Sequence, residues 1–237
     1  MEEIRQEIID FNLQFPQFAH FRITDKIGEG TFSSVYLAVD LKHYHYANCA
    51  HTDPDCCIVA LKRIYPNSSP SRILNELATL RELGHHPNIA TLIEVMRHQD
   101  QIVAVLPFFA HDLFRDYFRH LDTAQIRTYL GGLLLALERV HRCRIIHRDI
   151  KPSNFLYNVA KGKGVLVDFG LAQVFNLIQK QALGRLEKPS GPHRGPKGGY
   201  IEDDPRPSVR ASRAGTRGFR APEVLFKVVH QTTGTLT

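Results

Sequence analysis

The sequence lacks any apolar run approaching the roughly 18–20 residues that a membrane-spanning helix needs. Its first residues, MEEIRQEIIDF, are acidic and lack the apolar core of a secretory signal. We also find no internal repeat. These absences predict a protein without a membrane partner or a secretory route. With 43% hydrophobic and 23% charged residues among 237, the composition is that of an ordinary globular protein.

Cysteine is scarce, and Cys49, Cys56, Cys57 and Cys143 do not have the spacing of a disulfide framework. They fit a reducing, intracellular compartment. The net charge of +6 raises the question of nucleic-acid binding. However, eight Lys or Arg and only four Asp or Glu lie in one polar stretch, 174–213, with no aromatic pattern that suggests base stacking. We therefore expect no direct nucleic-acid binding.

Residues 1–20 predict an amphipathic lead-in helix, because Ile4, Ile8 and Phe11 share one face and Pro16 ends the pattern. The next runs, FRITDKIGEG and SSVYLAVD, flank a glycine turn and predict a β-hairpin. CIVALKRIY predicts a third strand. HPNIATLIEVMRHQDQIVAVLPFF predicts two more strands around a polar turn.

Between the third and fourth of these strands, SSPSRILNELATLREL predicts a helix. Ser71 is the expected N-cap, and Ile73, Leu77 and Leu80 share one face.

After Pro107 the pattern becomes helical. Asp122, with Gln125 three residues later, predicts a capped start for a long helix that runs through His141. Its expected buried stripe is formed by Ile126, Leu130, Leu133, Leu134 and Leu137.

A strand-rich part followed by a helical part predicts an α+β fold with two lobes. After the lead-in at 1–20, the first lobe covers 21–106 with an inserted loop at 42–57, and the second covers 107–237. Within the second, the stretch at about 174–213 holds ten Gly or Pro residues, and after Leu186 apolar residues nearly vanish. It cannot bury enough surface to offset its chain entropy, so we expect a disordered insertion.

Two motifs, HRDIKPSN and VDFG, carry the residues needed to move a phosphoryl group from ATP. Asp149 is placed to orient a substrate hydroxyl or accept its proton, and Lys151 to stabilise the transferring group. Asn154 and Asp168 supply the hard oxygen ligands that Mg²⁺ prefers. His147 is expected to be a packed structural residue.

Lys62 lies in the middle of a predicted strand with apolar neighbours, so an inward-pointing ammonium group needs an acidic partner. Glu76 and Glu82 of the following helix are the candidates. Leu80, one turn after Glu76, would face the core, which favours Glu76. Such a pair would hold the α- and β-phosphates of ATP.

The run GEGTFSSV (Gly28–Val35) lies on the turn of the first hairpin, where glycine lets backbone N–H groups approach phosphate oxygens. Taken alone, it is equally compatible with a simple tight turn. Its position between two strands excludes a dinucleotide-binding fingerprint, which leads from a strand into a helix.

Together these motifs, with RAPE downstream, resemble the eukaryotic protein kinase family over residues 21–237. Lys151 and Thr216 match its serine/threonine branch, with Thr216 and Arg217 in the substrate loop. The resemblance implies that Phe169 packs beneath the catalytic helix, and that ATP and Mg²⁺ are the cofactors. It implies that ATP is bound by Ile27, Gly28, Glu29, Gly30, Thr31, Phe32, Ser33, Val35, Ala60, Lys62, Glu76, the gatekeeper Leu106 and the hinge residues Pro107, Phe108 and Phe109.

GEGTFSSVYLA, HRDIKPSNFLY, LVDFGLAQ and RAGTRGFRAPEVL further resemble the cell-division-cycle seven kinases, the catalytic subunits of the Dbf-four-dependent kinase. This resemblance implies a cell-cycle kinase of the nucleus that depends on a regulatory subunit. It also implies protein substrates among the subunits of the replicative helicase, so that phosphorylation initiates DNA replication.

Two alternatives stay open. The inserted loop is either a polar loop or a zinc site built from His43, His45, Cys49, His51, Cys56 and Cys57, although the spacing matches no paired zinc pattern. Arg213, Arg217 and Arg220 either favour an acidic or phosphorylated residue beside the target, or Arg220 pairs internally with a carboxylate.

The chain stops at Thr237, fourteen residues after Glu223 of RAPE. By the resemblance to kinases, later helices would support the catalytic loop, and without them apolar surface would be exposed. The alternative function is therefore that of an inactive, truncated kinase fragment that acts as an interaction module.

Overall fold

The computed structural model describes residues 2–30, 32–42, 57–66, 68–174, 215–220 and 222–225. The chain divides into a first unit, Met1–Arg139 with Pro152–Gly170, and a second unit, Val140–Lys151 with Leu171–Thr237. The predicted lobe boundary between residues 106 and 107 stays a prediction. Of the two predicted insertions, only residues 42, 57 and 174 are among the described residues, and the zinc candidates other than Cys57 lie outside them.

The first unit is built on a five-stranded antiparallel sheet in the order β1-β2-β3-β5-β4. All five predicted strands are confirmed. In β2 every second side chain is buried, as expected for a strand with one face toward the core. Their bounds are Phe21–Glu29 (β1), Ser33–Asp40 (β2), Ile58–Ile64 (β3), Glu94–His98 (β4) and Gln101–Pro107 (β5).

The strand register assigns neighbouring rows of side chains to opposite faces of this sheet. One row pairs Lys26 with Tyr36 and Tyr36 with Leu61. The adjacent row pairs Gly28 with Val35 and Val35 with Lys62. Because successive side chains of a strand point to opposite faces, Lys26 and Lys62 lie on different sides of the sheet.

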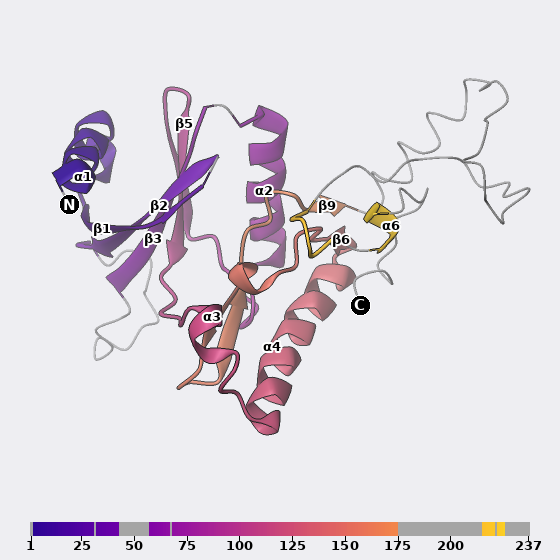
Figure 1. Cartoon of the computed structure of the whole chain (residues 1–237). Helices are drawn as coiled ribbons and strands as arrows, with labels where there is room; N and C mark the ends of the chain where they lie inside the picture. Colours follow the sequence, from indigo (N-terminus) through magenta and orange to yellow (C-terminus); the bar gives the residue numbers. More distant parts are fainter. Residues whose placement is uncertain are drawn as a thin grey trace, which may run out of the picture. The chain divides into compact units, whose positions relative to one another are not determined.

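The N-terminal helix α1 (Glu2–Gln14) and the short η1 (Pro16–Phe18) cover the face that carries Tyr36, which confirms the predicted lead-in helix. Phe11, Phe15 and Phe18 are at most 1% exposed. Their rings lie 4.8–5.7 Å apart, and the Phe11 ring lies 5.1 Å from that of Tyr36. Helix α2 lies on the other side of the sheet (Figure 1).

Helix α2 (Pro70–Leu83) begins two residues earlier than predicted. Its N-cap is Ser69, whose hydroxyl accepts from the backbone N–H of Arg72, so the expectation of Ser71 was wrong. The reason is Pro70, which has no N–H to lose and whose fixed φ suits the first helical position. Leu80 is buried as predicted.

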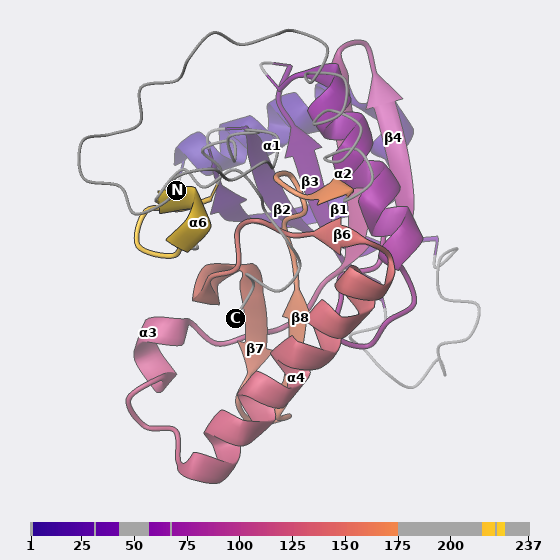
Figure 2. The ribbon, with the colours of Figure 1, turned by 90° about the vertical axis from the view of Figure 1, so that its right-hand side faces the viewer.

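Helix α4 (Thr123–Arg142) follows the short α3 (Phe114–Tyr117) and runs beside the hairpin β7 (Phe155–Asn158) and β8 (Lys163–Leu166) (Figure 2). The predicted cap is confirmed: Gln125 N–H donates to Asp122 Oδ1 at 2.8 Å, and Asp122 N–H donates to Gln125 Oε1 at 3.0 Å. The side chains of Asp122 and Gln125 thus each accept from the backbone N–H of the other residue.

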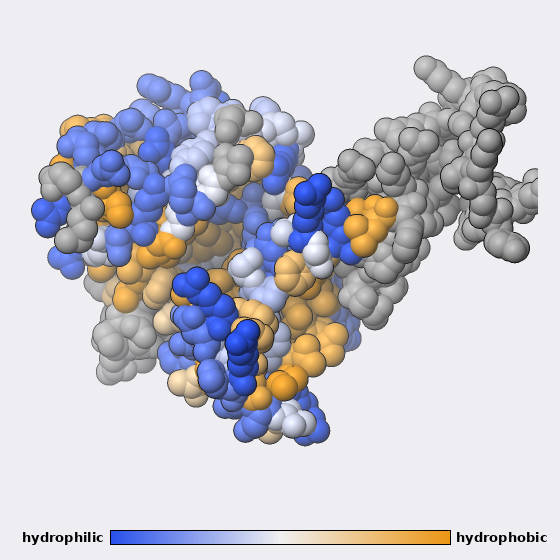
Figure 3. Space-filling model, viewed as in Figure 1, coloured by the Kyte–Doolittle hydropathy of each residue, from blue (hydrophilic) through white to orange (hydrophobic). Residues whose placement is uncertain are grey.

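The predicted buried stripe of α4 was largely wrong. Of its members only Leu137 is buried, and Leu133 is half-buried, whereas Ile126, Leu130 and Leu134 are 43–64% exposed. The helix has two adjacent apolar stripes. The stripe that contains Tyr129 faces the core, as shown by the ring of Tyr129, which packs on that of Phe155 with 5.1 Å between the ring centroids. The other stripe contributes to the apolar surface along α4 (Figure 3).

The described part of the second unit contains the end of α4, a two-stranded pairing of β6 (Ile145–Ile146) with β9 (Gln173–Val174), and α6 (Pro222–Leu225). The α+β class is confirmed. Within the described ranges, no helix of either unit combines the length and the apolar character that crossing a bilayer requires.

Candidate nucleotide-binding and phosphoryl-transfer sites

A cavity of about 600 Å³ opens within the first unit, under the β1–β2 hairpin. The structure places most of the predicted ATP-binding residues around it. Phe32 instead lines a smaller cavity of about 130 Å³ beside it, and Thr31 lies outside the described residues. The predicted residues that line the larger cavity are Ile27, Gly28, Glu29, Gly30, Ser33, Val35, Ala60, Lys62, Glu76, Leu106, Pro107, Phe108 and Phe109.

The ammonium group of Lys62 is held in this cavity by two carboxylates. Its Nζ lies 2.5 Å from Glu76 Oε1 and 3.4 Å from Asp168 Oδ1. The predicted pairing of Lys62 with Glu76 is therefore present, and Glu82 is not the partner. Burial alone would lower the pKa of Lys62, but the neighbouring charges of Glu76 and Asp168 raise it above its ordinary value. Lys62 is thus a fixed cation facing the cavity.

Asn154 and Asp168, the predicted metal ligands, both line the cavity. Asp168 has a φ of +62°, in the left-handed region that costs a non-glycine residue energy and that is common at functional sites. Among the described residues no group of three His, Cys, Asp or Glu side chains could hold a metal ion by itself. The two oxygen donors fit Mg²⁺, which is commonly held by one or two carboxylates together with phosphates and water.

A backbone hydrogen bond of Gly30 closes the turn of the β1–β2 hairpin. The Gly30 N–H donates to the carbonyl of Ser33 at 2.8 Å. Next to the turn, the guanidinium of Arg72 lies 4.6 Å from the Phe32 ring and donates to the carbonyl of Gly170 at 2.9 Å. A cation–π contact thus connects the glycine-rich turn with α2.

Several cavity residues were missed by the sequence analysis. His111 follows the predicted hinge, and its Nδ1 lies 2.8 Å from the carbonyl of Phe109. Among the missed residues, Leu156 could have been predicted from its spacing, because it lies on β7 two positions after Asn154. The missed lining residues also include Leu80, His86, Pro87, Ile89, Ala90, Thr91, Ser153, Val165 and Val167.

In the second unit, Asp149 forms a compact cluster with Lys151 and Thr216. Asp149 Oδ1 accepts from the Thr216 backbone N–H at 2.9 Å and from its hydroxyl at 2.8 Å. Asp149 Oδ2 lies 2.9 Å from Lys151 Nζ, which also donates to the Thr216 hydroxyl at 2.7 Å. The predicted catalytic pair and the predicted substrate-loop threonine therefore meet.

These contacts set the charge of Asp149. Burial would raise the pKa of its carboxyl group, but the hydrogen bonds from Lys151 and Thr216 lower it below the ordinary value. Asp149 is thus ionised at neutral pH and can accept a hydrogen bond from a hydroxyl. His147 is fully buried, and its Nδ1 accepts from the Asp149 N–H at 3.3 Å, in agreement with its expected structural role.

The approach of Thr216 to Asp149 depends on Gly215. Its φ is +86°, and a Cβ there would lie 2.8 Å from the carbonyl oxygen of Arg148. Arg220 Nε donates to the carbonyl of Gly215 at 3.1 Å, so this guanidinium contacts a backbone oxygen. Arg217 is exposed, and Arg213 lies outside the described residues.

Comparison with known proteins agrees with this geometry. Residues 21–235 match the protein kinase domain. The chain is 43% identical to a probable cell division control protein 7 homolog 2 of Encephalitozoon cuniculi, over 98% of the chain and 65% of that protein. It is 40% identical to the cell cycle serine/threonine-protein kinase hsk1 of Schizosaccharomyces pombe, over 96% of the chain and 50% of that protein.

A human cell division cycle 7-related protein kinase is 41% identical over 72% of the chain and 28% of its own length. The chain thus spans about two thirds or less of the length of these relatives. The domain match covers most of the chain and includes every residue of both sites described above. The chain therefore belongs to the protein kinase family.

Proposed function

We propose that this chain is the catalytic part of a protein serine/threonine kinase that transfers the γ-phosphate of ATP to protein substrates. The observation that carries the proposal is the bonding of Lys62 to both Glu76 and Asp168 within a cavity of about 600 Å³. A fixed cation beside two acidic groups matches the needs of a bound triphosphate with its metal ion.

In this proposal the adenine and ribose occupy the apolar part of the cavity, which Val35, Ala60 and Leu156 line. Lys62 neutralises charge on the α- and β-phosphates. Asn154 and Asp168 would hold Mg²⁺, which supplies charge neutralisation at the β- and γ-phosphates when bound. Most of the catalysis would thus be positioning and electrostatic stabilisation.

Asp149 would orient the substrate hydroxyl, and Lys151 would stabilise the charge that develops on the transferring group. Thr216 supports this role because its hydroxyl already bonds both side chains, at 2.8 and 2.7 Å. The hydroxyl of a substrate serine or threonine can donate to a carboxylate in the same way as the Thr216 hydroxyl does to Asp149. Thr216 would therefore fix the direction in which the Asp149 carboxylate faces.

The finer assignment follows the names of the relatives, which are cell division control and cell cycle kinases. We propose nuclear substrates among the subunits of the replicative helicase, phosphorylated when DNA replication begins, and a regulatory subunit that activates the kinase. Exposed Arg217 favours an acidic or phosphorylated residue beside the target. A peptide array without any preference for Asp, Glu or phosphoserine would contradict this last assignment.

The test of the proposed activity compares the chain with Asp149→Asn and, as a matched control, Asp116→Asn, an exposed carboxyl on α3. Each is incubated with γ-labelled Mg-ATP and a serine-containing acidic protein. We expect Asp149→Asn to lower phosphate transfer by roughly 10²–10⁴-fold and Asp116→Asn to leave it unchanged. Equal transfer by all three proteins would contradict the proposal. Nucleotide binding without transfer by the unmodified chain would favour the interaction module instead.

A further inference from the structure

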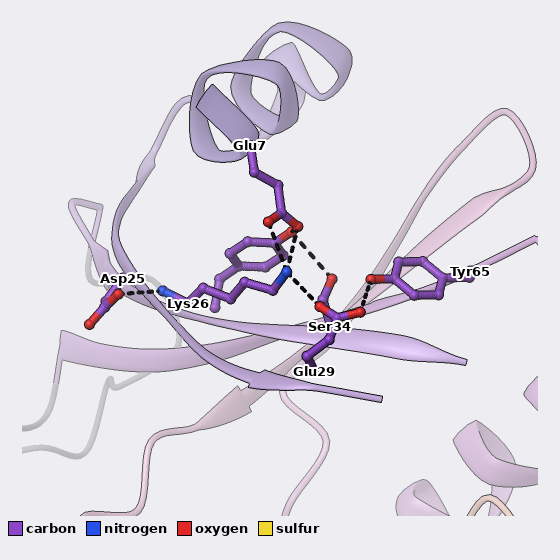
Figure 4. Close-up of polar contacts among 7 residues, drawn as sticks. Glu7, Asp25, Lys26, Glu29, Ser34 and Tyr65 are labelled. Atoms are coloured by element: carbon purple, nitrogen blue, oxygen red, sulfur yellow. Dashed lines mark hydrogen bonds and ion pairs between the residues drawn. The ribbon is translucent and has the colours of Figure 1, made fainter. Parts of the chain in front are cut away.

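Figure 4 shows a second acid–lysine–acid cluster, which lies on the face of the sheet that α1 covers. We call this the outer face, and the opposite face, which carries Lys62, the inner face. The ammonium group of Lys26, on β1, lies 2.8 Å from Glu7 Oε2 and 2.5 Å from Glu29 Oε2. Glu7 belongs to α1 and Glu29 ends β1 at the glycine-rich turn. One lysine therefore connects the N-terminal helix with the turn proposed to contact the phosphates.

Both carboxylates of this cluster have a further partner. The hydroxyl of the fully buried Tyr36 donates to Glu7 Oε1 at 2.5 Å. The hydroxyl of Tyr65 donates to Glu29 Oε1 at 2.7 Å, and its backbone N–H donates to the carbonyl of Phe32 at 2.9 Å. The turn is thus held from the outside at Glu29 and at Phe32. Although Glu29 lines the cavity, its carboxylate is bound on the outer face.

Helix α1 is a rigid support for Glu7. Phe11 and Phe15 are buried against the sheet, and the guanidinium of Arg63 lies 5.7 and 5.8 Å from their two rings. Arg63 also donates to Gln14, the last residue of α1, at 3.0 Å. The position of Glu7 is therefore fixed by apolar packing and not by its ion pair alone.

The charges of the cluster reinforce one another. Hydrogen bonds from Lys26 and Tyr65 lower the pKa of Glu29. Burial would raise the pKa of Glu7, but hydrogen bonds from Lys26 and Tyr36 lower it. Bonds from Glu29 and Glu7 raise the pKa of Lys26. All three groups are charged at neutral pH, so the contacts persist under the conditions in which a kinase works.

We propose that α1 positions the glycine-rich turn for the ATP phosphates through the contacts Glu7–Lys26–Glu29. The inference rests on the nucleotide site proposed above, and Lys26 is a positioning residue because it acts through Glu29 and touches no nucleotide. Backbone N–H groups bind phosphate well only when their direction is fixed in advance. Releasing Glu29 would let the turn move away from the cavity and leave the adenine-binding part unchanged.

The test measures binding of Mg-AMP-PNP and of adenosine by titration calorimetry to the whole chain and to Lys26→Met, Lys26→Arg and Glu7→Gln. Asp10→Asn is the matched control, because it removes one exposed carboxylate from the same helix, where its partner is Gln6 on α1 itself. We expect Lys26→Met to weaken Mg-AMP-PNP by about three- to tenfold, as for loss of partly exposed charged contacts. Adenosine affinity should stay the same.

The other proteins separate positioning from general damage. Glu7→Gln should weaken Mg-AMP-PNP by a smaller factor in the same direction, Lys26→Arg should recover most of the affinity, and Asp10→Asn should match the unmodified chain. An equal loss of adenosine and Mg-AMP-PNP affinity in Lys26→Met, or no loss of either, overturns the inference while leaving the nucleotide site intact. Failure of the unmodified chain to bind Mg-AMP-PNP overturns the nucleotide site and the inference with it.

Discussion

The two faces of the N-terminal sheet carry the same chemical arrangement, a lysine between two carboxylates, in different surroundings. Lys62 and Lys26 have nearly equal side-chain exposure, 16% and 17%. Their partners differ at one position. In the inner cluster Glu76 is only 9% exposed, although Asp168 is 48% exposed. In the outer cluster Glu7 and Glu29 are 31% and 51% exposed. The inner cluster faces a cavity, and the outer cluster lies between a helix and a strand.

This difference separates two uses of an ion pair. A little-exposed pair such as Lys62–Glu76 is costly to break, because either partner alone would be a poorly solvated charge. A pair exposed like Lys26–Glu29 contributes little stability, and its main effect is on geometry. We therefore propose that the inner face supplies the chemistry and that the outer charges set the position of the turn, while apolar packing of α1 stabilises the outer face.

The largest expected effect concerns the packing of the outer face. We expect Phe11→Ala to lower the free energy of unfolding by about 3–5 kcal/mol, because it removes a fully buried ring that contacts Phe15, Phe18 and Tyr36. Leu13→Ala, on the same helix but 76% exposed, should change it by less than about 0.5 kcal/mol. Urea denaturation checks both, and equal effects would contradict the packing of α1.

The next effect compares the two lysines directly. Lys62→Met should lower phosphate transfer by about 100-fold or more, as for loss of a preorganised charge that stabilises the transition state. Lys26→Met should lower it by less than about tenfold. Initial rates at several ATP concentrations measure both, with thermal melting as the check on folding. Comparable losses would mean that the two faces do not have separate roles.

A smaller effect is expected at Tyr36, whose hydroxyl is buried against Glu7. Tyr36→Phe keeps the packing but removes the hydrogen bond, and should lower the free energy of unfolding by about 1–2 kcal/mol. Tyr65→Phe removes the corresponding bond to Glu29, which is 51% exposed, and should cost less. Denaturation of the two variants side by side tests this order, and the reverse order would contradict the proposed role of burial.

The smallest effect is a pH dependence of the outer cluster. The pKa values of Glu7 and Glu29 lie below their ordinary value of 4.5, so the folded state binds these protons less readily than the unfolded state. Their contribution to stability is full above about pH 4.5 and is lost as the pH falls through the lowered values. The stability difference between the unmodified chain and Glu29→Gln should therefore shrink between pH 7 and pH 3. An unchanged difference in denaturation would contradict it.

The sequence predicted the inner face better than the outer one for physical reasons. Lys62 and Glu76 are each embedded in a short periodic element, so the strand and helix patterns alone direct them toward one another. Glu7, Lys26 and Glu29 join a helix to a strand end through tertiary packing, which leaves no local pattern. Periodicity also finds apolar stripes without showing which stripe meets a partner, and the exposed Leu130 and Leu134 of α4 illustrate this.

The most direct test of the account is covalent labelling with an acyl-phosphate derivative of ATP, which acylates lysine amines held near its phosphates. Peptide mass spectrometry then compares Lys62 with Lys26 in the same sample. We predict strong labelling of Lys62 that excess Mg-ATP prevents, and weak labelling of Lys26 that Mg-ATP does not change. Equal labelling of the two lysines, or labelling of Lys62 that Mg-ATP does not reduce, would contradict the assignment of the inner face to the ATP phosphates.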